Sequence, residues 1–179
     1  GAGALHACMI ARELEIATLV VPPVASTLCA AGMLLSDLQH DFARSCVGPL
    51  ARVGRDHLRS LVGEMVAEGD ALLRREGLPP DRMSHQVALD LRYVKQYHEV
   101  TVPVSREAVA TGDFEAMAAL FHAEHDRLYG YQLAADGTPL ELINLRVRSV
   151  GRTDKPLLPR VERGGADAAG ALLGRRRAY

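Results

Sequence analysis

The chain has 179 residues, a length that supports one good hydrophobic core or at most two small ones. Hydrophobic residues make up 48% of the sequence and charged residues 24%, which excludes a disordered tail, and the apolar stretches are far too short to span a membrane. The 21 basic and 22 acidic side chains nearly cancel, so we expect no binding to nucleic acid or to a membrane surface.

The cysteines and the first residues indicate where the chain comes from. Cys8, Cys29 and Cys46 are odd in number and form no CxxC pattern, so they predict reduced, mostly buried thiols of a cytoplasmic protein. None has the basic or helix-start setting of a nucleophile, and we expect them to serve packing. The chain opens on Gly1 without an initiator methionine, so we expect it to be part of a longer protein.

Residues 1–47 predict the closing piece of an α/β layer. A helical pattern covers residues 4–15, and the β-branched run at 18–21, stopped by two prolines, is typical of a buried strand. The small apolar residues at 24–35 favour a tightly packed, buried helix. Residues 37–47 alternate loosely, as in a strand.

Residues 48–151 predict an α+β domain. A stripe of apolar residues at three-four spacing predicts a helix over 53–76, interrupted by Gly69, which marks a close contact. Alternation then predicts strands over 87–93 and 98–104. This order of elements indicates helices packed on an antiparallel sheet.

The end of the chain completes this domain. Asp113 is a plausible N-cap for a second helix that runs to about Tyr129, where Gly130 stops it. A strand follows at 141–150, with Ile143, Leu145 and Val147 expected to point inward. Residues 152–179 lack periodicity and predict a linker or tail.

The turn before the first helix is the first candidate site. Gly1, Ala2, Gly3 and Ala4 form the kind of small-residue turn that lets backbone N–H groups approach a nucleotide, and His6 follows on the same side. From the spacing alone, a turn that simply enters a packed helix is the commoner explanation.

Histidines and carboxylates give further candidates, each with two interpretations. His122 and His125 are three residues apart on a helix and could share a metal, although a buried, hydrogen-bonded His125 is favoured. The group at 37–41, with two aspartates and His40, could bind a cation or lie on a strand surface. The His98–Glu99 pair could line a cleft or a subunit contact.

Charged residues also alternate on two expected strands. If these strands are neighbours, Asp90 and Arg146 could pair across the sheet, or their face could meet another domain. The Arg-rich face does not indicate RNA binding, since it has no aromatic platform beside it.

Several segments recur in a fixed order along residues 1–151. They are GAGALHA at 1–7, VVPP at 20–23, AGMLLSD at 31–37, DLRYVKQYHEVTVP at 90–103, the stretch from FHAEH to YGY at 121–131, and ELINLRVR at 141–148. Together they resemble the hydantoinase A / 5-oxoprolinase family, and the resemblance covers most of the chain.

The resemblance implies a large protein of the actin/Hsp70-like ATPase superfamily. Such proteins use ATP to open cyclic amides such as hydantoins and 5-oxoproline, or to drive ketone carboxylation, commonly with a hydantoinase B-type subunit or domain. It implies that Gly1, Ala2, Gly3, Ala4 and His6 belong to an adenosine-binding turn. The family usually has Gly-Gly-Ala-Gly-Pro there; this chain begins at the second Gly, and Ala4 stands in place of the proline.

The phosphate-binding loops of such an ATPase are missing from the sequence. The Asp136-Gly137-Thr138 segment is more simply a β-turn between a helix and a strand. We therefore expect ATP and Mg in the longer protein, no cofactor or metal on this chain alone, and catalytic residues that the sequence does not identify. The alternatives are a ketone carboxylase subunit and a non-catalytic structural module that forms homo-oligomers.

Overall fold

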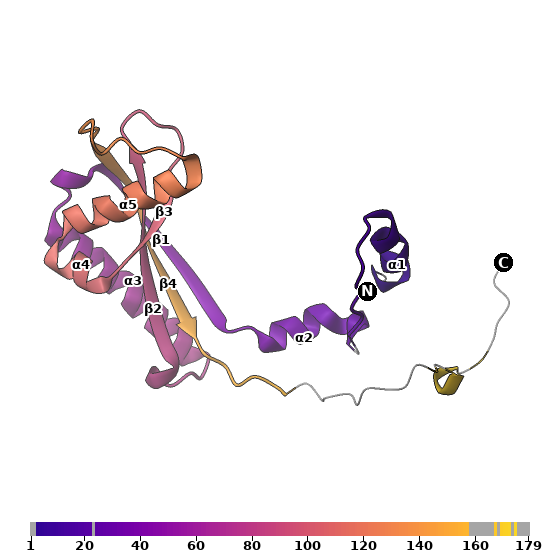
Figure 1. Cartoon of the computed structure of the whole chain (residues 1–179). Helices are drawn as coiled ribbons and strands as arrows, with labels where there is room; N and C mark the ends of the chain where they lie inside the picture. Colours follow the sequence, from indigo (N-terminus) through magenta and orange to yellow (C-terminus); the bar gives the residue numbers. More distant parts are fainter. Residues whose placement is uncertain (1–2, 23, 158–166, 168, 173, 175–179) are drawn as a thin grey trace.

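The computed structural model describes residues 3–22, 24–157, 167, 169–172 and 174. Its main unit is a four-stranded antiparallel sheet in the order β1-β4-β2-β3 (Figure 1). The strands are β1 (Leu38–Pro49), β2 (Met83–Tyr93), β3 (Val100–Val104) and β4 (Leu140–Gly151). The α+β class and the antiparallel sheet expected from the sequence are confirmed.

Helices α3 (Arg55–Arg75), α4 (Arg106–Thr111) and α5 (Phe114–Tyr129) pack on one face of this sheet. Met65 of α3 and Phe121 of α5 share the core with Leu89 of β2, and all three are fully buried. The opposite face presents mostly polar side chains, and we call it the free face. Burial of the apolar faces of α3 and α5 is the main stabilising term of this unit.

Local sequence signals explain where the helices begin and end. The Asp113 carboxylate accepts a hydrogen bond from the backbone N–H of Ala116 at 3.0 Å, so the expected N-cap is confirmed. Gly130 ends α5 at φ +75°, a conformation that favours glycine. The six-residue helix α4 was not expected; Ser105 caps it through a bond from the Ala108 N–H at 3.0 Å.

Helix α3 lies close against the sheet at Gly69. A Cβ atom built on Gly69 would overlap Ser149 Oγ on β4, and would lie 2.7 Å from Ser149 Cβ and 3.3 Å from the ring of Phe42. The close contact expected at this interruption of the apolar stripe is confirmed. Only glycine leaves room for Ser149 at this crossing.

Strand β4 changes its inward face part-way along. Its register with β2 shifts between Asp90 and Leu91, where Asp90 pairs with Asn144 but Leu91 pairs with Leu142. As a result Leu142 is fully buried, whereas Ile143, which we expected to point inward, is only half-buried. An irregularity of this kind breaks the strict alternation on which the expectation rested.

The boundary expected between residues 47 and 48 falls inside β1. This strand pairs with β4 from Leu38 to Pro49, with one irregularity between Ser45 and Gly48. The strand therefore belongs to the same sheet as the elements that follow it.

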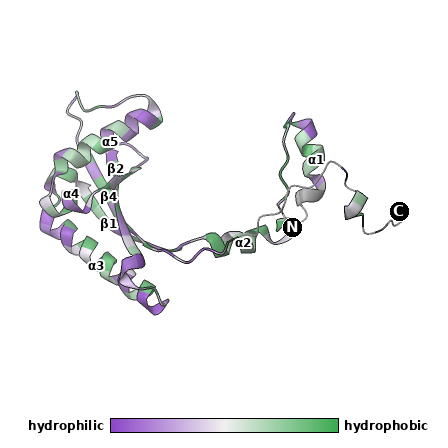
Figure 2. Ribbon diagram, turned by 60° about the horizontal axis from the view of Figure 1, so that its bottom comes forward, coloured by the Kyte–Doolittle hydropathy of each residue, from purple (hydrophilic) through white to green (hydrophobic). Residues whose placement is uncertain are grey.

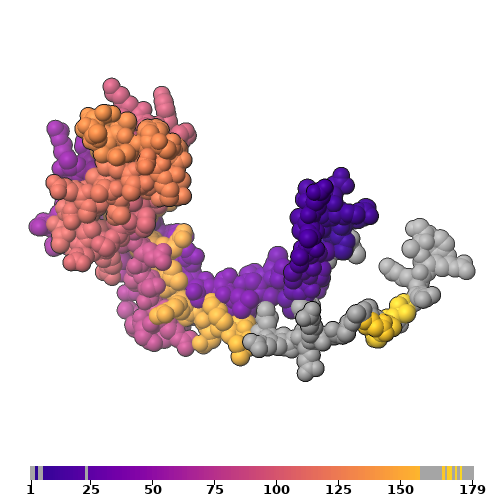
Figure 3. All heavy atoms as spheres, viewed as in Figure 1, coloured from indigo at the N-terminus to yellow at the C-terminus, as the bar shows by residue number. Residues whose placement is uncertain are grey.

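The segment before β1 projects from the sheet unit (Figures 1 and 3). It contains α1 (Gly3–Glu13), a short 3-10 turn at Ala25–Thr27 and α2 (Leu28–Leu35). The expected strand at 18–21 is wrong, because these residues pair with no strand of the described chain. The burial expected for 24–35 is also wrong, since α2 has no buried residue.

Exposed apolar side chains dominate this projecting segment, and α2 stands out as hydrophobic in Figure 2. Val20 and Met33 are each 78% exposed, and Met9 is 65% exposed. Cys8 and Cys29 are also exposed and Cys46 is half-buried, so the prediction of mostly buried thiols is wrong for this chain. Exposed apolar surface of this extent is typical of a surface that packs against another domain or protein. In the described part of the chain, no helix is both long and apolar enough to cross a membrane.

Candidate functional site

The expected nucleotide turn lies at the start of α1. Gly3 and Ala7 line a hollow of about 610 Å³ together with residues 19–22 and 25–30, most of which are small or apolar. His6 is exposed on α1 and is not part of this wall. Gly1 and Ala2 lie outside the described residues, as does the side chain of Ala4. The structure thus brings Gly3, but not His6, to a hollow large enough for a planar ring.

A second candidate site lies at the end of α5, beside the loop that joins β2 to β3. The Leu133 N–H donates to Tyr93 Oη at 2.7 Å, so the hydroxyl proton of Tyr93 is directed to His122 Nδ1, also at 2.7 Å. Burial raises the pKa of Tyr93, which keeps this donor protonated. His122 is therefore the neutral tautomer that carries its proton on Nε2.

His125 lies deeper in the same cluster and is 1% exposed. Its Nδ1–H donates to the Tyr131 carbonyl at 2.9 Å, and its Nε2 accepts from the Gln96 amide at 3.2 Å. The buried, hydrogen-bonded His125 that the sequence favoured is confirmed. Both ring nitrogens are occupied, so a metal shared with His122 has no free ligand there. Within the described residues, no three His, Cys, Asp or Glu side chains are grouped to hold a metal ion.

The neutral state of His122 predicts a dependence of stability on pH. Burial, and then the neighbouring His125, lower the pKa of His122 from its ordinary value of 6.5. Below that value the unfolded chain binds more protons than the native one, so this contribution to stability is lost as the pH falls through the native pKa. We expect the free energy of unfolding to fall more between about pH 7.5 and about pH 5 in the wild type than in His122→Gln, by urea titration. Equal falls in both proteins would contradict this assignment.

The loop that follows β2 begins with a tight turn. The Gln96 N–H donates to the Tyr93 carbonyl at 3.0 Å, and Lys95 within this turn has a φ of +76°. This left-handed conformation is strained for a residue with a Cβ atom and is normally taken by glycine. The side chain of Gln96 then ties the loop to α5 through its bond to His125, and to Tyr131 Oη at 3.3 Å.

We expect Lys95→Gly to raise the free energy of unfolding by about 0.5 kcal/mol, since relief of the left-handed strain exceeds the extra entropy that glycine loses on folding. Lys95→Ala is the matched control, because it removes the same side chain without relieving the backbone. Urea unfolding of both variants checks this. The turn is not strained if the glycine variant is no more stable than the alanine variant.

A pocket of about 280 Å³ opens beside this turn. We call it the Tyr97 pocket; its wall consists of Lys95, Gln96, Tyr97, His98, His125, Tyr129 and Tyr131. His98 lies in the wall of a cleft, which is one of the two positions that the sequence analysis gave for it. The sequence did not reveal this pocket, because its tyrosines come from segments about 30 residues apart.

The free face of the sheet carries a polar cluster around Asp90. Arg146 Nε donates to both carboxylate oxygens of Asp90, at 2.7 and 2.8 Å, which confirms the pair expected across the sheet. Asn144 Nδ2 at 2.9 Å and Thr101 Oγ1 at 2.7 Å complete the set of donors. Asp90 is fully buried in this cluster, so its charge is compensated entirely by these three partners.

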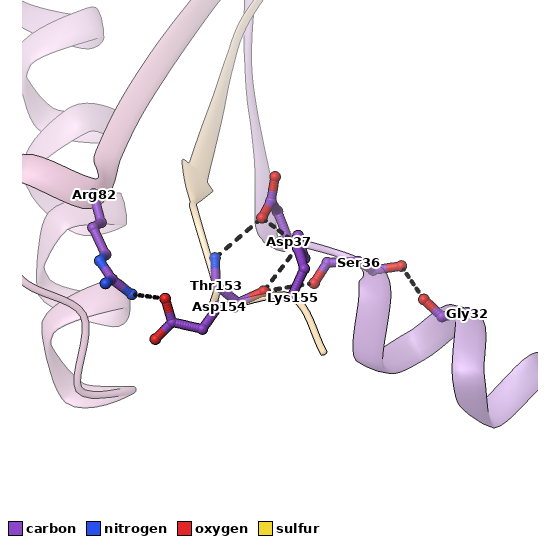
Figure 4. A network of polar contacts seen from close by, with 7 residues as sticks. All are labelled: Gly32, Ser36, Asp37, Arg82, Thr153, Asp154 and Lys155. Carbon is purple, nitrogen blue, oxygen red and sulfur yellow. Dashed lines mark hydrogen bonds and ion pairs between the residues drawn. The ribbon is translucent and has the colours of Figure 1, made fainter. Parts of the chain in front are cut away.

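The carboxylates at 37–41 do not form a cation site. His40 pairs with Glu76 at 3.0 Å and Asp41 with Arg148 at 2.7 Å, so each side chain of the group has a different partner. Asp37 accepts from Lys155 Nζ at 2.6 Å and from the Thr153 N–H at 3.1 Å, and these bonds lower its pKa (Figure 4).

The contacts of Asp37 also join the two segments that leave the sheet unit, residues 36–37 before β1 and residues 152–155 after β4. The Thr153 hydroxyl donates to the Ser36 carbonyl at 3.0 Å, and Arg82 pairs with Asp154 at 2.9 Å, which lowers the pKa of that carboxyl (Figure 4). For the group at 37–41, this arrangement favours the strand-surface interpretation over a cation site. Residues 36–37 hold together the two segments that leave the sheet.

The structure reveals one serine-histidine-aspartate arrangement that the sequence did not indicate. His85 contacts Ser149 Oγ through Nδ1 at 2.8 Å and Asp70 through Nε2 at 3.0 Å. Ser149 is fully buried and lies against Gly69, so no substrate can reach its hydroxyl. We interpret this group as a structural bridge from α3 to β2 and β4, since a nucleophile needs access to its substrate.

Together, a helical segment with exposed apolar faces and an α+β unit with an antiparallel sheet define the architecture of this chain. A match to the hydantoinase/oxoprolinase family model covers residues 1–42. The caprolactamase alpha subunit of Pseudomonas jessenii is 30% identical over 162 residues, which cover 89% of this chain and 23% of that protein. The structure of ATP-dependent caprolactamase from the same organism matches 95% of this chain and 25% of that chain, with a TM-score of 0.69 and 29% identity.

Two further relatives are enzymes of different names. The acetophenone carboxylase gamma subunit of Aromatoleum aromaticum is 27% identical, over 100% of this chain and 25% of that protein. The 5-oxoprolinase 1 of Arabidopsis thaliana is 29% identical, over 91% of this chain and 13% of that protein. The chain belongs to the hydantoinase/oxoprolinase family. It spans about a quarter or less of the length of these relatives.

Proposed function

We propose that this chain is the C-terminal part of an ATP-dependent enzyme that hydrolyses cyclic amides such as hydantoins, 5-oxoproline or other lactams. The observation that carries the proposal is the match of nearly the whole chain, projecting segment included, to an ATP-dependent caprolactamase. ATP supplies the activation, because phosphorylation of an amide oxygen turns a poor electrophile into a reactive one. This part of the protein supplies binding surface and support rather than the reacting groups.

The projecting segment is proposed to close an actin/Hsp70-like ATPase domain, which holds ATP and Mg. We assign the turn at Gly1, Ala2, Gly3 and Ala4 to the adenosine, with His6 in support. The hollow beside Gly3 and the open space around its Cα support this, because outside its chain neighbours and its own helix backbone no described atom lies within 4 Å of a Cβ built there. The exposed apolar faces of α1 and α2 would pack on the remainder of that domain.

The domain boundaries follow from this assignment. Pairing of β1 with β4 on both sides of residue 47, from Leu38 to Pro49, supports a boundary close to Asp37, before β1, rather than at residue 47. The sheet unit then runs to residue 151, and residues 152–179 form the linker or tail.

A ketone carboxylase subunit is the alternative function. The acetophenone carboxylase gamma subunit aligns over 100% of this chain, which supports it. Both functions use ATP to activate an oxygen atom, so this part of the protein could serve either.

We also propose a cytoplasmic enzyme that works with a hydantoinase B-type subunit and forms homo-oligomers. Two relatives are an alpha and a gamma subunit, which supports a multi-subunit assembly. The three free cysteines are consistent with a reducing compartment.

The test uses the longer protein that contains this chain, together with its B-type subunit. ATP hydrolysis is measured with hydantoin, 5-oxoproline and caprolactam, and separately with acetophenone plus bicarbonate. Stimulation by a cyclic amide supports the proposal, and stimulation by the ketone alone supports the alternative. Gly3→Ala should raise the KM for ATP by about tenfold if the nucleotide approaches this backbone, a loss of about 1.4 kcal/mol of binding.

A matched control separates nucleotide contact from a change in the helix. Gly63→Ala on α3, outside the projecting segment, likewise adds a Cβ that meets no other side chain or element within 4 Å, and it should leave the KM unchanged. If both variants raise the KM equally, Gly3 has no special place in the ATP site.

A further inference from the structure

The Tyr97 pocket lies within the most exposed aromatic surface of the sheet unit. Tyr97 is 91% exposed, Tyr129 51% and Tyr131 47%. Leu128, next to Tyr129 on α5, is also half exposed. Tyrosines gathered around a hollow are typical of the centre of a protein interface, where they bury a large area at a small entropic cost.

Hydrogen bonds and ring contacts hold the Gln96, Tyr129 and Tyr131 part of this surface in place. The Gln96 amide donates to His125 Nε2 and Tyr131 Oη, and its oxygen accepts from the Tyr93 N–H at 3.4 Å. The His125 ring in turn contacts the rings of Tyr129 and Tyr131, with centroids 4.7 and 4.9 Å apart. A partner would therefore meet a wall that is preformed around Tyr129 and Tyr131, and would lose little free energy in ordering that part.

The wall of the pocket carries the positive charge of Lys95. Lys95 and His98 contribute to the wall, and no carboxylate does. Glu124, one turn before Leu128 on α5, is bound by Arg127 at 2.6 and 2.8 Å. Lys95 occupies its place despite a left-handed backbone, which is typical of a residue kept for its side chain.

We propose that the Tyr97 pocket is the docking site of a partner subunit, which inserts an acidic side chain flanked by apolar ones. The acidic group meets Lys95, and the apolar neighbours cover Tyr97 and Tyr129. This inference rests on the proposed function for the existence of the partner, but the site and its chemistry come from the exposure, rigidity and charge of this surface.

The experiment measures the dissociation constant between the longer protein and its B-type subunit by interferometry. Tyr97→Ala removes the exposed ring, and Lys95→Gly removes the ammonium while relaxing the turn, so neither variant is expected to unfold the domain. Val47→Ala, at a 67% exposed position on the edge strand β1, opposite β3, and Arg75→Ala, at an exposed position on α3, are the matched controls.

We expect each pocket variant to weaken binding at least tenfold and each control less than twofold. Unchanged binding in the pocket variants, with a tight wild-type complex, would overturn the docking site and leave the partnership standing. No complex with the wild type would overturn both the docking site and the proposed partnership. Unchanged binding with a loss of amide-dependent ATP hydrolysis would overturn docking in favour of a small-ligand pocket.

Discussion

Gly69→Ala is expected to lower the free energy of unfolding by about 3 kcal/mol. Alanine is the better helix former by about 1 kcal/mol, but this gain is outweighed at the crossing of α3 and β4. The new methyl group would overlap Ser149 Oγ and press on the ring of Phe42, and overpacking of this kind costs about 1–3 kcal/mol or more. Displacing Ser149 also breaks its bond to His85, which adds about 1 kcal/mol.

Gly63→Ala is the matched control on the same helix. Gly63 is exposed, and a Cβ there would meet no atom of the described chain within 4 Å, so we expect a gain of about 0.5–1 kcal/mol. Urea unfolding followed by circular dichroism measures both variants. In the Gly69→Ala background, Ser149→Gly removes the overlapping atoms and should restore part of the loss. A loss in Gly63→Ala as large as that in Gly69→Ala would assign the effect to the helix rather than to its contact with β4.

The sequence predicted those elements whose apolar side chains are buried inside this chain. The stripe of α3 and the alternation of β2 follow the periodicity of a helix and of a strand, because one face of each packs on the core. The interruption at Gly69 was visible for the same reason. Register is a property of two strands, so the shift that buries Leu142 in place of Ile143 could not be inferred from the alternation of β4 alone.

The projecting segment was predicted less well, for a physical reason. Residues 18–35 have the composition of a buried core, but in this chain they find no core to join. A hydrophobic composition indicates that a segment is buried. It does not say whether the segment packs against its own domain or against another part of a protein. The exposed apolar surface of α2 and the expectation of a longer protein are therefore consistent with each other.

Some features of the candidate sites could likewise be predicted from the sequence, and others could not. His125 and the pair of Asp90 with Arg146 were accessible from the sequence, since helix spacing and strand alternation fix the face on which each residue lies. The left-handed turn at Lys95 and the bridge from Asp70 through His85 to Ser149 were not, because they depend on how separate elements are brought together.

Asp90→Ala is expected to lower the free energy of unfolding by about 3 kcal/mol. Removal of one partner of a buried ion pair costs about 3–5 kcal/mol, since the remaining groups lose their compensation. Half-buried Asn144 would lose the acceptor of its amide, whereas the exposed Thr101 hydroxyl can donate to water instead. Arg146 is 46% exposed and can turn to water, which places the expected loss at the lower end of that range.

Asp41→Ala provides the comparison, because the pair of Asp41 with Arg148 has the same chemistry and lies on the same face of the sheet. Its side chains are 60% and 50% exposed, and solvent-exposed pairs contribute about 0.2–1 kcal/mol, so we expect a loss of about 0.5 kcal/mol. This smaller loss should also shrink in 1 M salt, about the concentration at which surface charges are screened within 3 Å, whereas the loss in Asp90→Ala should persist. If urea unfolding gave equal losses for the two variants, burial would not be what makes Asp90 important, and the polar cluster on the free face would be no more than a set of surface contacts.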